Sequence, residues 1–160
     1  MKEISRNCTL RVHAQVDALD AQAQELLDAA LLATKSAYAP YSDFHVGAAV
    51  QLANGELLPG CNQENAAFPS GLCAERVAFF TAGAFYPGVP IESVAITIRS
   101  ASKADHEPAA PCGGCLQVMR DVELRQDKPI RVLLKGSGDA VYEADSIAHF
   151  LPFGFSLIEK

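Results

Sequence analysis

Hydrophobic and polar residues alternate along residues 8–16, which is the period of a half-buried β-strand. We expect this segment to form an added edge strand whose apolar side carries Cys8, Leu10, Val12, Ala14 and Val16. From residue 20 to residue 37 the spacing becomes helical, and Asp20 is placed to cap the start of the helix. The helix face expected to be buried carries Ala23, Leu26, Leu27, Ala30 and Leu31.

Two apolar runs, residues 45–52 and 56–61, flank Asn54 and Gly55. An Asn-Gly pair between such runs is the strongest short-range signal for a β-hairpin. We therefore predict that the two runs pair as antiparallel strands.

The second half of the chain alternates between helical and strand periods. The pattern predicts helices over residues 72–82 and 112–124, strands over 93–98, 130–134 and 141–144, and a short closing helix over 145–151. This order is typical of an α/β fold whose sheet is mostly covered. The short turn at residues 136–139 leaves no room for a crossover helix, so the last two strands are predicted to be antiparallel.

Composition narrows the functional classes. With 160 residues, 49% of them hydrophobic, residues 1–160 are expected to form a single domain. We expect a cytoplasmic protein with no membrane partner, because neither an export signal nor a membrane-spanning run is recognisable. A net charge of -6 without clustered Lys and Arg argues against nucleic acid as a partner. Five cysteines are an odd number, which favours metal binding or catalysis over a disulfide framework.

The spacing of Cys112 and Cys115 puts both sulfurs on one face of the first turn of a predicted helix, where unpaired backbone N–H groups favour thiolate. Taken alone, this pair also fits a redox pair or two ordinary buried cysteines. Cys73 begins another predicted helix, so a third sulfur can join them. Three protein ligands are typical of catalytic zinc, because the open position holds a water whose pKa the metal lowers.

Glu75 lies two residues after Cys73 and is placed to move protons. A lone glutamate is more often part of a solvated helix surface, but Pro111 and the cysteines complete a pattern typical of zinc deaminases. We therefore predict one Zn²⁺ per chain, held by Cys73, Cys112 and Cys115, with Glu75 as the catalytic residue. The histidines show no ligand spacing with the cysteines and are not expected to bind the metal: His13, His45, His106 and His149.

Beyond the metal pattern, the sequence resembles the short, homotetrameric, zinc-dependent cytidine deaminases. Five blocks in family order, spanning residues 38–155, carry the resemblance. They are Tyr38-Ala-Pro-Tyr-Ser-x-Phe44-x-Val-Gly-Ala49, Gly60-Cys-Asn62-x-Glu64-Asn-Ala66, Cys73-Ala-Glu75-Arg76, Pro111-Cys-Gly-x-Cys115-x-Gln-Val118 and Leu151-Pro-x-x-Phe155. The resemblance implies a three-layer α/β/α fold with a mixed five-stranded sheet. The N-terminal extension, residues 1–19, lies outside the resemblance, and its alternating pattern predicts the extra edge strand.

By this resemblance the protein hydrolyses free cytidine and 2′-deoxycytidine to uridine and 2′-deoxyuridine with release of ammonia, in pyrimidine salvage. Zinc-bound hydroxide would attack C4, while Glu75 protonates N3 and later the departing ammonia. Phe44 is implied to pack against the nucleoside. Asn62 and Glu64 are implied to bind the ribose 3′-hydroxyl, and the backbone N–H of Ala74 the pyrimidine carbonyl oxygen.

The resemblance also implies roles outside the immediate chemistry. Arg76 would donate hydrogen bonds to the ligand sulfurs and offset the charge of three thiolates. The family usually has a second arginine directly after the last cysteine, where this chain has Leu116. Phe155 would cover the pyrimidine of a neighbouring subunit, so that the active sites of a homotetramer are shared. Terminal aromatic residues more commonly anchor their own core, which is the simpler interpretation of Phe155.

Three alternatives stay open on the sequence. The chain could be a related zinc deaminase of blasticidin, of a nucleotide or of a base inside RNA, although the last two need basic surfaces. It could be a zinc-stabilised module without catalysis, although a structural site usually has a fourth protein ligand. It could also be a redox protein that uses Cys112 and Cys115 free of metal.

Overall fold

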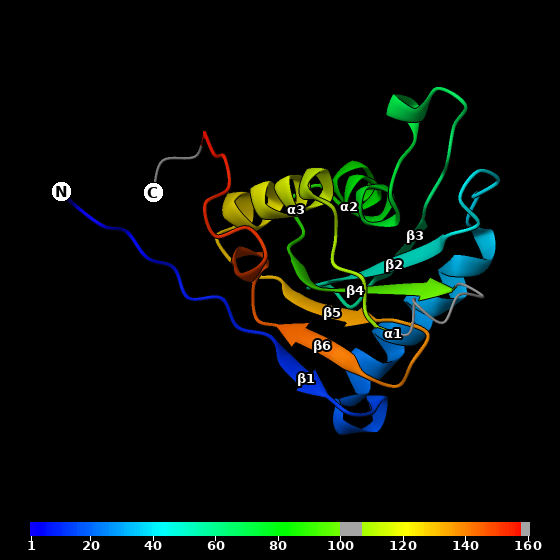
Figure 1. Cartoon of the computed structure of the whole chain (residues 1–160), viewed down its shortest axis with the longest axis horizontal. Coiled ribbons are helices and arrows are strands. Elements are labelled where there is room, and N and C mark those ends of the chain that lie inside the picture. The colour runs from blue at the N-terminus through cyan, green and yellow to red at the C-terminus, as the bar shows by residue number, and fades with distance from the viewer. Residues whose placement is uncertain (100–106, 158–160) are drawn as a thin grey trace.

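The computed structural model describes residues 1–99 and 107–157 (Figure 1). Its strands are β1 Arg11–His13, β2 His45–Leu52, β3 Leu57–Cys61, β4 Ile91–Arg99, β5 Arg131–Lys135 and β6 Val141–Ala144. Its α-helices are α1 Ala21–Ala33, α2 Ala74–Phe85 and α3 Gly113–Gln126. Short 3-10 turns are η1 Val16–Ala18, η2 Thr34–Ser36, η3 Phe68–Ser70 and η5 Ile147–His149. His106 lies outside the described residues.

The six strands of the described residues form one mixed sheet in the order β1-β6-β5-β4-β2-β3. Only β4 and β5 are parallel among its neighbouring strands, and they are joined through α3, the kind of crossover that a parallel pair requires. The other neighbours pair antiparallel, including the predicted last two strands, β5 and β6. The prediction of a mixed five-stranded sheet with an added N-terminal edge strand is confirmed.

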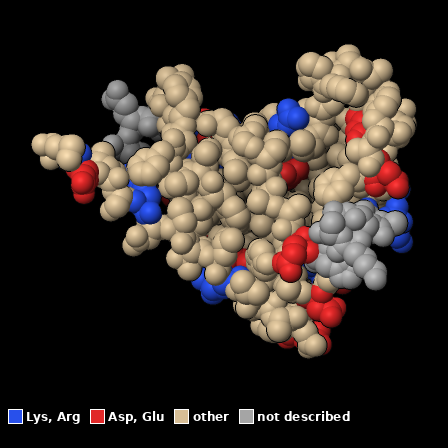
Figure 2. All heavy atoms as spheres, viewed as in Figure 1, with Lys and Arg blue, Asp and Glu red and all other residues tan. Residues whose placement is uncertain are grey.

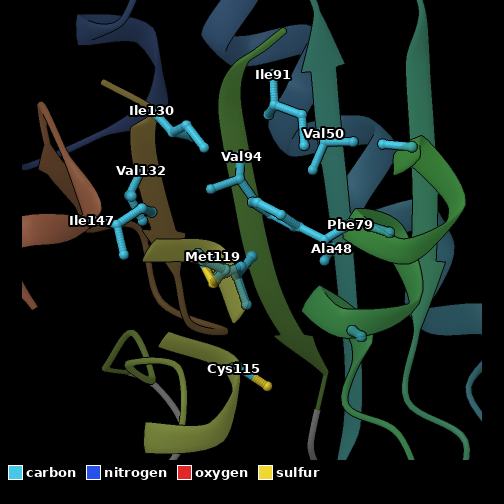
Figure 3. Close-up of a cluster of buried hydrophobic side chains, with 14 of the residues drawn as sticks. Ala48, Val50, Phe79, Ile91, Val94, Cys115, Met119, Ile130, Val132 and Ile147 are labelled. Carbon is cyan, nitrogen blue, oxygen red and sulfur yellow. The ribbon is translucent and has the colours of Figure 1, made fainter. Parts of the chain in front are cut away.

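Helices cover both faces of the sheet, which gives the predicted three layers (Figure 1). Successive residues of β4 point to opposite faces. Val94 therefore joins the core against α2 and α3, whereas Ala95 joins the core against α1. Figure 3 shows the first core, in which Phe79 of α2 and Met119 of α3 lie close to the sheet residues. The ends of α2 and α3 are thus fixed by packing on one face of the sheet.

The start of α1 follows the sequence prediction. The carboxylate of Asp20 accepts a hydrogen bond from the backbone N–H of Ala23 at 2.9 Å and caps the helix. Four of the five predicted core residues of this helix are buried, but Leu31 is 47% exposed, so its assignment to the buried face is wrong. Successive helical residues are rotated by about 100°, and Leu31 therefore turns away from the sheet while Ala30 faces it.

The edge strand β1 lies where it was predicted, but it is shorter and the prediction of its buried side is wrong. Val12 is 64% exposed. The opposite side carries Arg11 and His13, which lie 3.1 Å and 2.6 Å from the carboxylate oxygens of buried Glu143 on β6. This strand is therefore held by polar side-chain contacts with Glu143 and not by its apolar side.

The predicted hairpin between β2 and β3 is confirmed. Gly55 adopts a φ of 89°, and its backbone N–H donates to the carbonyl of Leu52 at 2.9 Å. A glycine takes this conformation without steric cost. The predicted closing helix is shorter than expected: only the single 3-10 turn η5 forms, capped by the hydroxyl of Ser146, which accepts from the backbone N–H of Ala148 at 3.0 Å.

One glycine brings the start of α2 close to β3. A Cβ atom on Gly60 would lie 2.6 Å from the carbonyl oxygen of Ala74 and 2.6 Å from the backbone nitrogen of Ala78. Real Cβ atoms do not come so close to backbone atoms, so a larger residue would push α2 away from the sheet. The position of the first turn of α2 therefore depends on Gly60.

On the side of the molecule shown in Figure 2, the Lys and Arg side chains of the described residues are scattered among other residues and form no continuous basic patch. The segment that carries η3 stands out from the body of the molecule at the upper right of this view (Figures 1 and 2). Across the described ranges, none of the helices combines the length and the apolar character that crossing a membrane requires.

Candidate metal centre and active site

The N-terminal ends of α2 and α3 bring three cysteine side chains together. Cys73 immediately precedes α2, Cys112 immediately precedes α3, and Cys115 lies in the first turn of α3. The Sγ atoms of Cys73 and Cys112 are 4.0 Å apart, those of Cys112 and Cys115 are 3.5 Å apart, and all three lie within 4.8 Å of one another. Cys115 is buried, Cys73 half-buried and Cys112 exposed. The three residues predicted as metal ligands therefore meet in space.

The spacing of these sulfurs fits one zinc ion. In a tetrahedral site with Zn–S distances of about 2.3 Å, neighbouring sulfurs lie about 3.8 Å apart. The separations of 3.5 Å and 4.0 Å lie on either side of this value. Three protein ligands leave one tetrahedral position open, which is the arrangement of catalytic zinc sites.

The thiols differ in their affinity for protons. The pKa of Cys73 is lowered to about 5, first because the Cys115 thiol donates a hydrogen bond to it and then because Arg76 lies beside it. The pKa of Cys115 is raised, first because its thiol donates that hydrogen bond to Cys73 and then because the thiol is buried. Backbone N–H groups at a helix start also favour thiolate. The lowered pKa of Cys73 favours its thiolate, which is the form that binds metals.

Glu75 lies in the first turn of α2, two residues after Cys73. It is only 4% exposed, so it does not belong to a solvated helix surface. Burial raises the pKa of its carboxyl group, and the charge of Cys73 raises it further. A carboxyl group whose pKa lies closer to neutrality can both accept and return a proton, which suits the predicted catalytic role.

Arg76 directs its guanidinium toward the same cluster. Its Nη2 donates to the carbonyl oxygen of Gly71 at 3.2 Å and lies 4.0 Å from the Sγ of Cys73. Its Nε is buried and finds no hydrogen-bond partner among the described residues. The positive charge therefore lies beside the thiolate that it was predicted to support.

An open cleft of about 510 Å³ adjoins the cluster. Four of the predicted site residues line it: Asn62, Glu64, Cys73 and Arg76. A volume of this size is typical of sites for small molecules. Cys73 of the cluster therefore lines the same cavity as the two residues predicted to bind the ribose, whereas Glu75, Cys112 and Cys115 are not part of its lining.

Asn62 and Glu64 also hold the polypeptide around this cleft. The side-chain oxygen of Asn62 accepts from the backbone N–H of Val46 at 2.9 Å, and its amide donates to the carbonyl of Phe44 at 2.8 Å. One oxygen of Glu64 accepts from the backbone N–H of Tyr41 at 2.8 Å, and the other accepts from the hydroxyl of Ser42. The hydroxyl of Ser42 is the main reason why the pKa of Glu64 is lowered. Both residues therefore position the strand and loop that flank the cleft.

The other predicted substrate contacts lie in two places. Phe44 directly precedes β2 and is fixed through its carbonyl by Asn62. Ala74 is the buried first residue of α2, so its backbone N–H lies among the free donors of a helix start. Phe155 does not line the cleft of its own chain: it is 68% exposed and lies beside α3, where Gln117 donates to its carbonyl oxygen.

The sequence interpretation missed an aromatic pair at the cleft. The rings of Tyr41 and Phe68 lie edge to face with centroids 5.8 Å apart, and both residues line the cavity. Such pairs are stabilising beyond the area that they bury. Tyr41 lies within one of the recognised sequence blocks, but no spacing rule joins it to a residue of η3, so the pairing had no signal in the sequence.

The remaining histidines lie in other surroundings. His13 contacts Glu143, His45 lies 3.1 Å from a carboxylate oxygen of Asp43, and His149 accepts from a backbone N–H at 3.1 Å. Each of these three therefore has a polar partner of its own in the described part of the chain.

Comparison with known proteins identifies the family to which this site belongs. The family model for the cytidine and deoxycytidylate deaminase zinc-binding region matches residues 20–127, which include the three cysteines and Glu75. A cytidine deaminase of Sporosarcina psychrophila is 37% identical over 139 residues, which cover 83% of this chain and 90% of the relative. This chain belongs to the cytidine deaminase family. It is accordingly a zinc-dependent enzyme, and the cysteine cluster fits the one zinc ion per chain.

Other cytidine deaminases agree in sequence and in structure. A cytidine deaminase of Halalkalibacterium halodurans is 40% identical over 99 residues, which cover 62% of this chain and 70% of the relative. The crystal structure of cytidine deaminase from Burkholderia pseudomallei is similar with a TM-score of 0.72 and 36% identity, covering 86% of this chain and 100% of that one. The cytidine deaminase family model begins at residue 20, so β1 and the extension around it precede the matched region.

Leu116 directly follows the last cysteine, at the position where the resemblance led us to expect an arginine. It is buried and packs into the apolar core against α2 and α3. The side chain at this position therefore adds no positive charge beside the sulfurs. Arg76 is left to face the thiolates from the cleft side.

Proposed function

We propose that the chain hydrolyses free cytidine and 2′-deoxycytidine to uridine and 2′-deoxyuridine with release of ammonia, as a step of pyrimidine salvage in the cytoplasm. The observation that carries this proposal is that buried Glu75 lies in the first turn of α2, two residues after Cys73 of the three-cysteine group. Membership of the cytidine deaminase family supports the cytosine nucleoside as substrate. The five cysteines, all free in the described residues, suit a reducing compartment. Residues 1–160 would act as one domain.

The chemistry follows from the donor set. When bound by the three cysteines, zinc supplies a water of lowered pKa as the nucleophile for C4 of the ring. Glu75 takes one proton of that water and gives it to N3. It then takes the proton of the hydroxyl that has been added at C4 and gives it to the amino group, which leaves as ammonia. Arg76 stabilises the thiolate of Cys73 throughout, through its charge. The raised pKa of Glu75 suits both directions of transfer.

Substrate recognition would use the cleft beside the cluster. The backbone N–H of Ala74 would donate to the pyrimidine carbonyl oxygen from the start of α2, where helix donors are free. Phe44 would pack against the nucleoside. Asn62 and Glu64 would bind the ribose 3′-hydroxyl. Their amide and carboxylate groups can form further hydrogen bonds in addition to those with the backbone.

A substrate panel tests this proposal. The decrease in ultraviolet absorbance on deamination is followed with cytidine, deoxycytidine, CMP, cytosine and blasticidin at equal concentrations. We expect turnover of both nucleosides and far slower turnover of the other three, because the cleft offers partners for a ribose hydroxyl and its lining includes one arginine and no lysine in the described residues. Faster turnover of blasticidin or CMP would contradict the proposed substrate, and no turnover of any compound by zinc-loaded protein would favour the non-catalytic alternative.

We further propose that the enzyme is a homotetramer in which Phe155 closes the active site of a neighbouring subunit. Phe155 is 68% exposed and lies outside the cleft of its own chain. Covering a nucleoside bound by a neighbour would exclude water from the reaction and add a stacking contact. The same patch would be reused by every subunit of a closed assembly.

Phe155→Ala is expected to raise the KM for cytidine by about 3- to 10-fold, the size of one aromatic contact. The subunit fold should survive, since the ring is exposed. Steady-state kinetics measure the effect, and light scattering in parallel gives the oligomeric state.

Phe153→Ala is the matched control, because Phe153 is 66% exposed on the same segment and has no proposed contact with substrate. Its KM should stay near that of the parent. A Phe155→Ala enzyme with the parent's KM, or a fully active monomer at low concentration, would show that the sites are not shared.

A further inference from the structure

The C-terminal segment is held at fixed points although its aromatic side chains are exposed. The backbone N–H of Leu151 donates to the carbonyl of Ile147 at 3.2 Å. A Cβ atom on Gly154 would lie 2.9 Å from the Cδ2 of Leu151, so Gly154 lies against the end of that flexible side chain. Leu151 in turn packs on the core against α2 and α3. Leu151 is thus anchored four residues before Phe155.

Gln117 fixes the next residue. Its Nε2 donates to the carbonyl oxygen of Phe155 at 2.8 Å, a good length for such a bond. Gln117 lies on α3 two residues after Cys115, and this helix begins directly after Cys112. The segment and this helix also form the two sides of a groove of about 320 Å³, with Phe155 and Leu157 on one side and Gln117 and Asp121 on the other.

An exposed aromatic ring on a fixed backbone is well suited to dock on the surface of another molecule. A loose tail would have to be ordered each time the ring docks, and the entropy lost would weaken docking. The bond from Gln117 removes part of that loss in advance, because it sets the backbone of Phe155 relative to α3. The ring itself stays 68% exposed, and the contact from Gln117 is made to the carbonyl and not to the ring.

We propose that Gln117 is a positioning residue that holds the backbone of Phe155 so that its ring is presented to the nucleoside bound by a neighbouring subunit. This inference rests on the proposed role of Phe155 in closing that site. Gln117 acts through Phe155 and touches neither the substrate nor the metal of its own chain. The helix α3 would then supply Cys115 to its own site and align an aromatic residue for the site of a neighbouring subunit.

Gln117→Glu is the sharpest test, because glutamate keeps the size of the side chain but replaces the donor with an acceptor that faces a carbonyl oxygen. We expect the KM for cytidine to rise by about 2- to 10-fold, as for the loss of one hydrogen bond, with kcat little changed. Zinc content should stay that of the parent. Gln117→Ala gives the same test if the glutamate variant folds poorly.

A double-mutant cycle with Phe155→Ala separates positioning from a general structural effect. If Gln117 acts through Phe155, the variant with both changes should have the KM of Phe155→Ala alone. Asp121→Asn is the matched control, since it changes a side chain of the same groove, one helical turn further on, that pairs with Arg125 at 3.0 Å. It should leave KM unchanged.

The outcomes are distinguishable. If Phe155→Ala raises KM but Gln117→Glu does not, or if the two effects multiply, the positioning role is wrong and the shared site stands. If Gln117→Glu loses zinc, it acts through Cys115 and the positioning role is again wrong. If Phe155→Ala itself leaves KM unchanged, the proposed closure fails and the positioning role fails with it.

Discussion

Replacing Glu75 with glutamine is expected to lower kcat for cytidine by about two to four orders of magnitude, the usual contribution of a positioned general acid and base. The amide has the shape of the carboxyl group but can neither accept nor return a proton. The three cysteines are untouched, so zinc should remain at about one ion per chain. Initial rates at saturating substrate, together with metal analysis of the same sample, measure both.

The stability of this variant should not fall. Burial raises the pKa of Glu75, so the folded state disfavours its ionised form. The resulting loss of folding stability is absent below the ordinary pKa of the carboxyl group and develops as the pH rises through the raised pKa. A neutral amide removes this loss at pH 7. An unchanged or higher Tm would therefore separate lost chemistry from lost folding, whereas near-normal turnover would show that Glu75 is not the proton carrier.

Glu143→Gln is the matched control, because Glu143 is a buried glutamate far along the sheet from the cleft. Burial alone would raise the pKa of Glu143, but hydrogen bonds from Arg11, His13 and Arg131 outweigh it and lower the pKa to about 2. The ionised form thus adds stability above the ordinary pKa, which is lost as the pH falls toward 2. The amide should lower stability at pH 7 by roughly 1–3 kcal/mol and leave kcat intact.

The sequence predicted those parts of the fold that depend on local signals. The cap at Asp20 and the hairpin at Gly55 each involve neighbours within a few residues, and both form as expected. The buried side of β1 could not be read in the same way. The apolar and polar residues of β1 do alternate, but buried Glu143 on a distant strand needs hydrogen-bonding partners. Arg11 and His13 reach it only when they face inward.

The candidate site shows the same division. Cys73 and Cys112 each stand at a helix start, which is a local property, and the ligand preferences of zinc are enough to group them with Cys115. Asn62 also forms hydrogen bonds to the backbone at the start of β2, and these bonds depend on which backbone groups lie near its amide. The location of Phe155 outside its own cleft depends on the path of the last segment along α3. Such relations arise from packing between distant parts of the chain.

Replacing any one of Cys73, Cys112 or Cys115 with alanine is expected to weaken zinc binding by more than about 100-fold, since loss of a direct ligand should exceed the effect of losing a supporting contact. Deamination should be lost with the metal. Because bound metal stabilises the folded state that holds it, the Tm should also become insensitive to added zinc. Metal analysis after dialysis and thermal unfolding with and without zinc measure these effects.

Two comparisons make this test specific to the metal. Cys8→Ala removes an exposed cysteine outside the cluster and should keep full zinc and activity. Arg76→Gln should keep zinc but bind it about 10- to 100-fold more weakly, because the charge beside Cys73 is lost while every ligand remains. An unchanged zinc affinity in this variant would remove Arg76 from the support of the sulfurs.

Cys112 gives the most decisive of the three substitutions. Cys115 is buried in the core, so its alanine variant also leaves a cavity and loses stability for reasons unrelated to metal. Cys112 is exposed, so alanine there disturbs little packing and zinc loss reports the missing ligand alone. Its sulfur lies 3.5 Å and 4.0 Å from the other two and joins them into one site. Full zinc content in Cys112→Ala would therefore overturn the three-cysteine assignment, even if both other variants lost the metal.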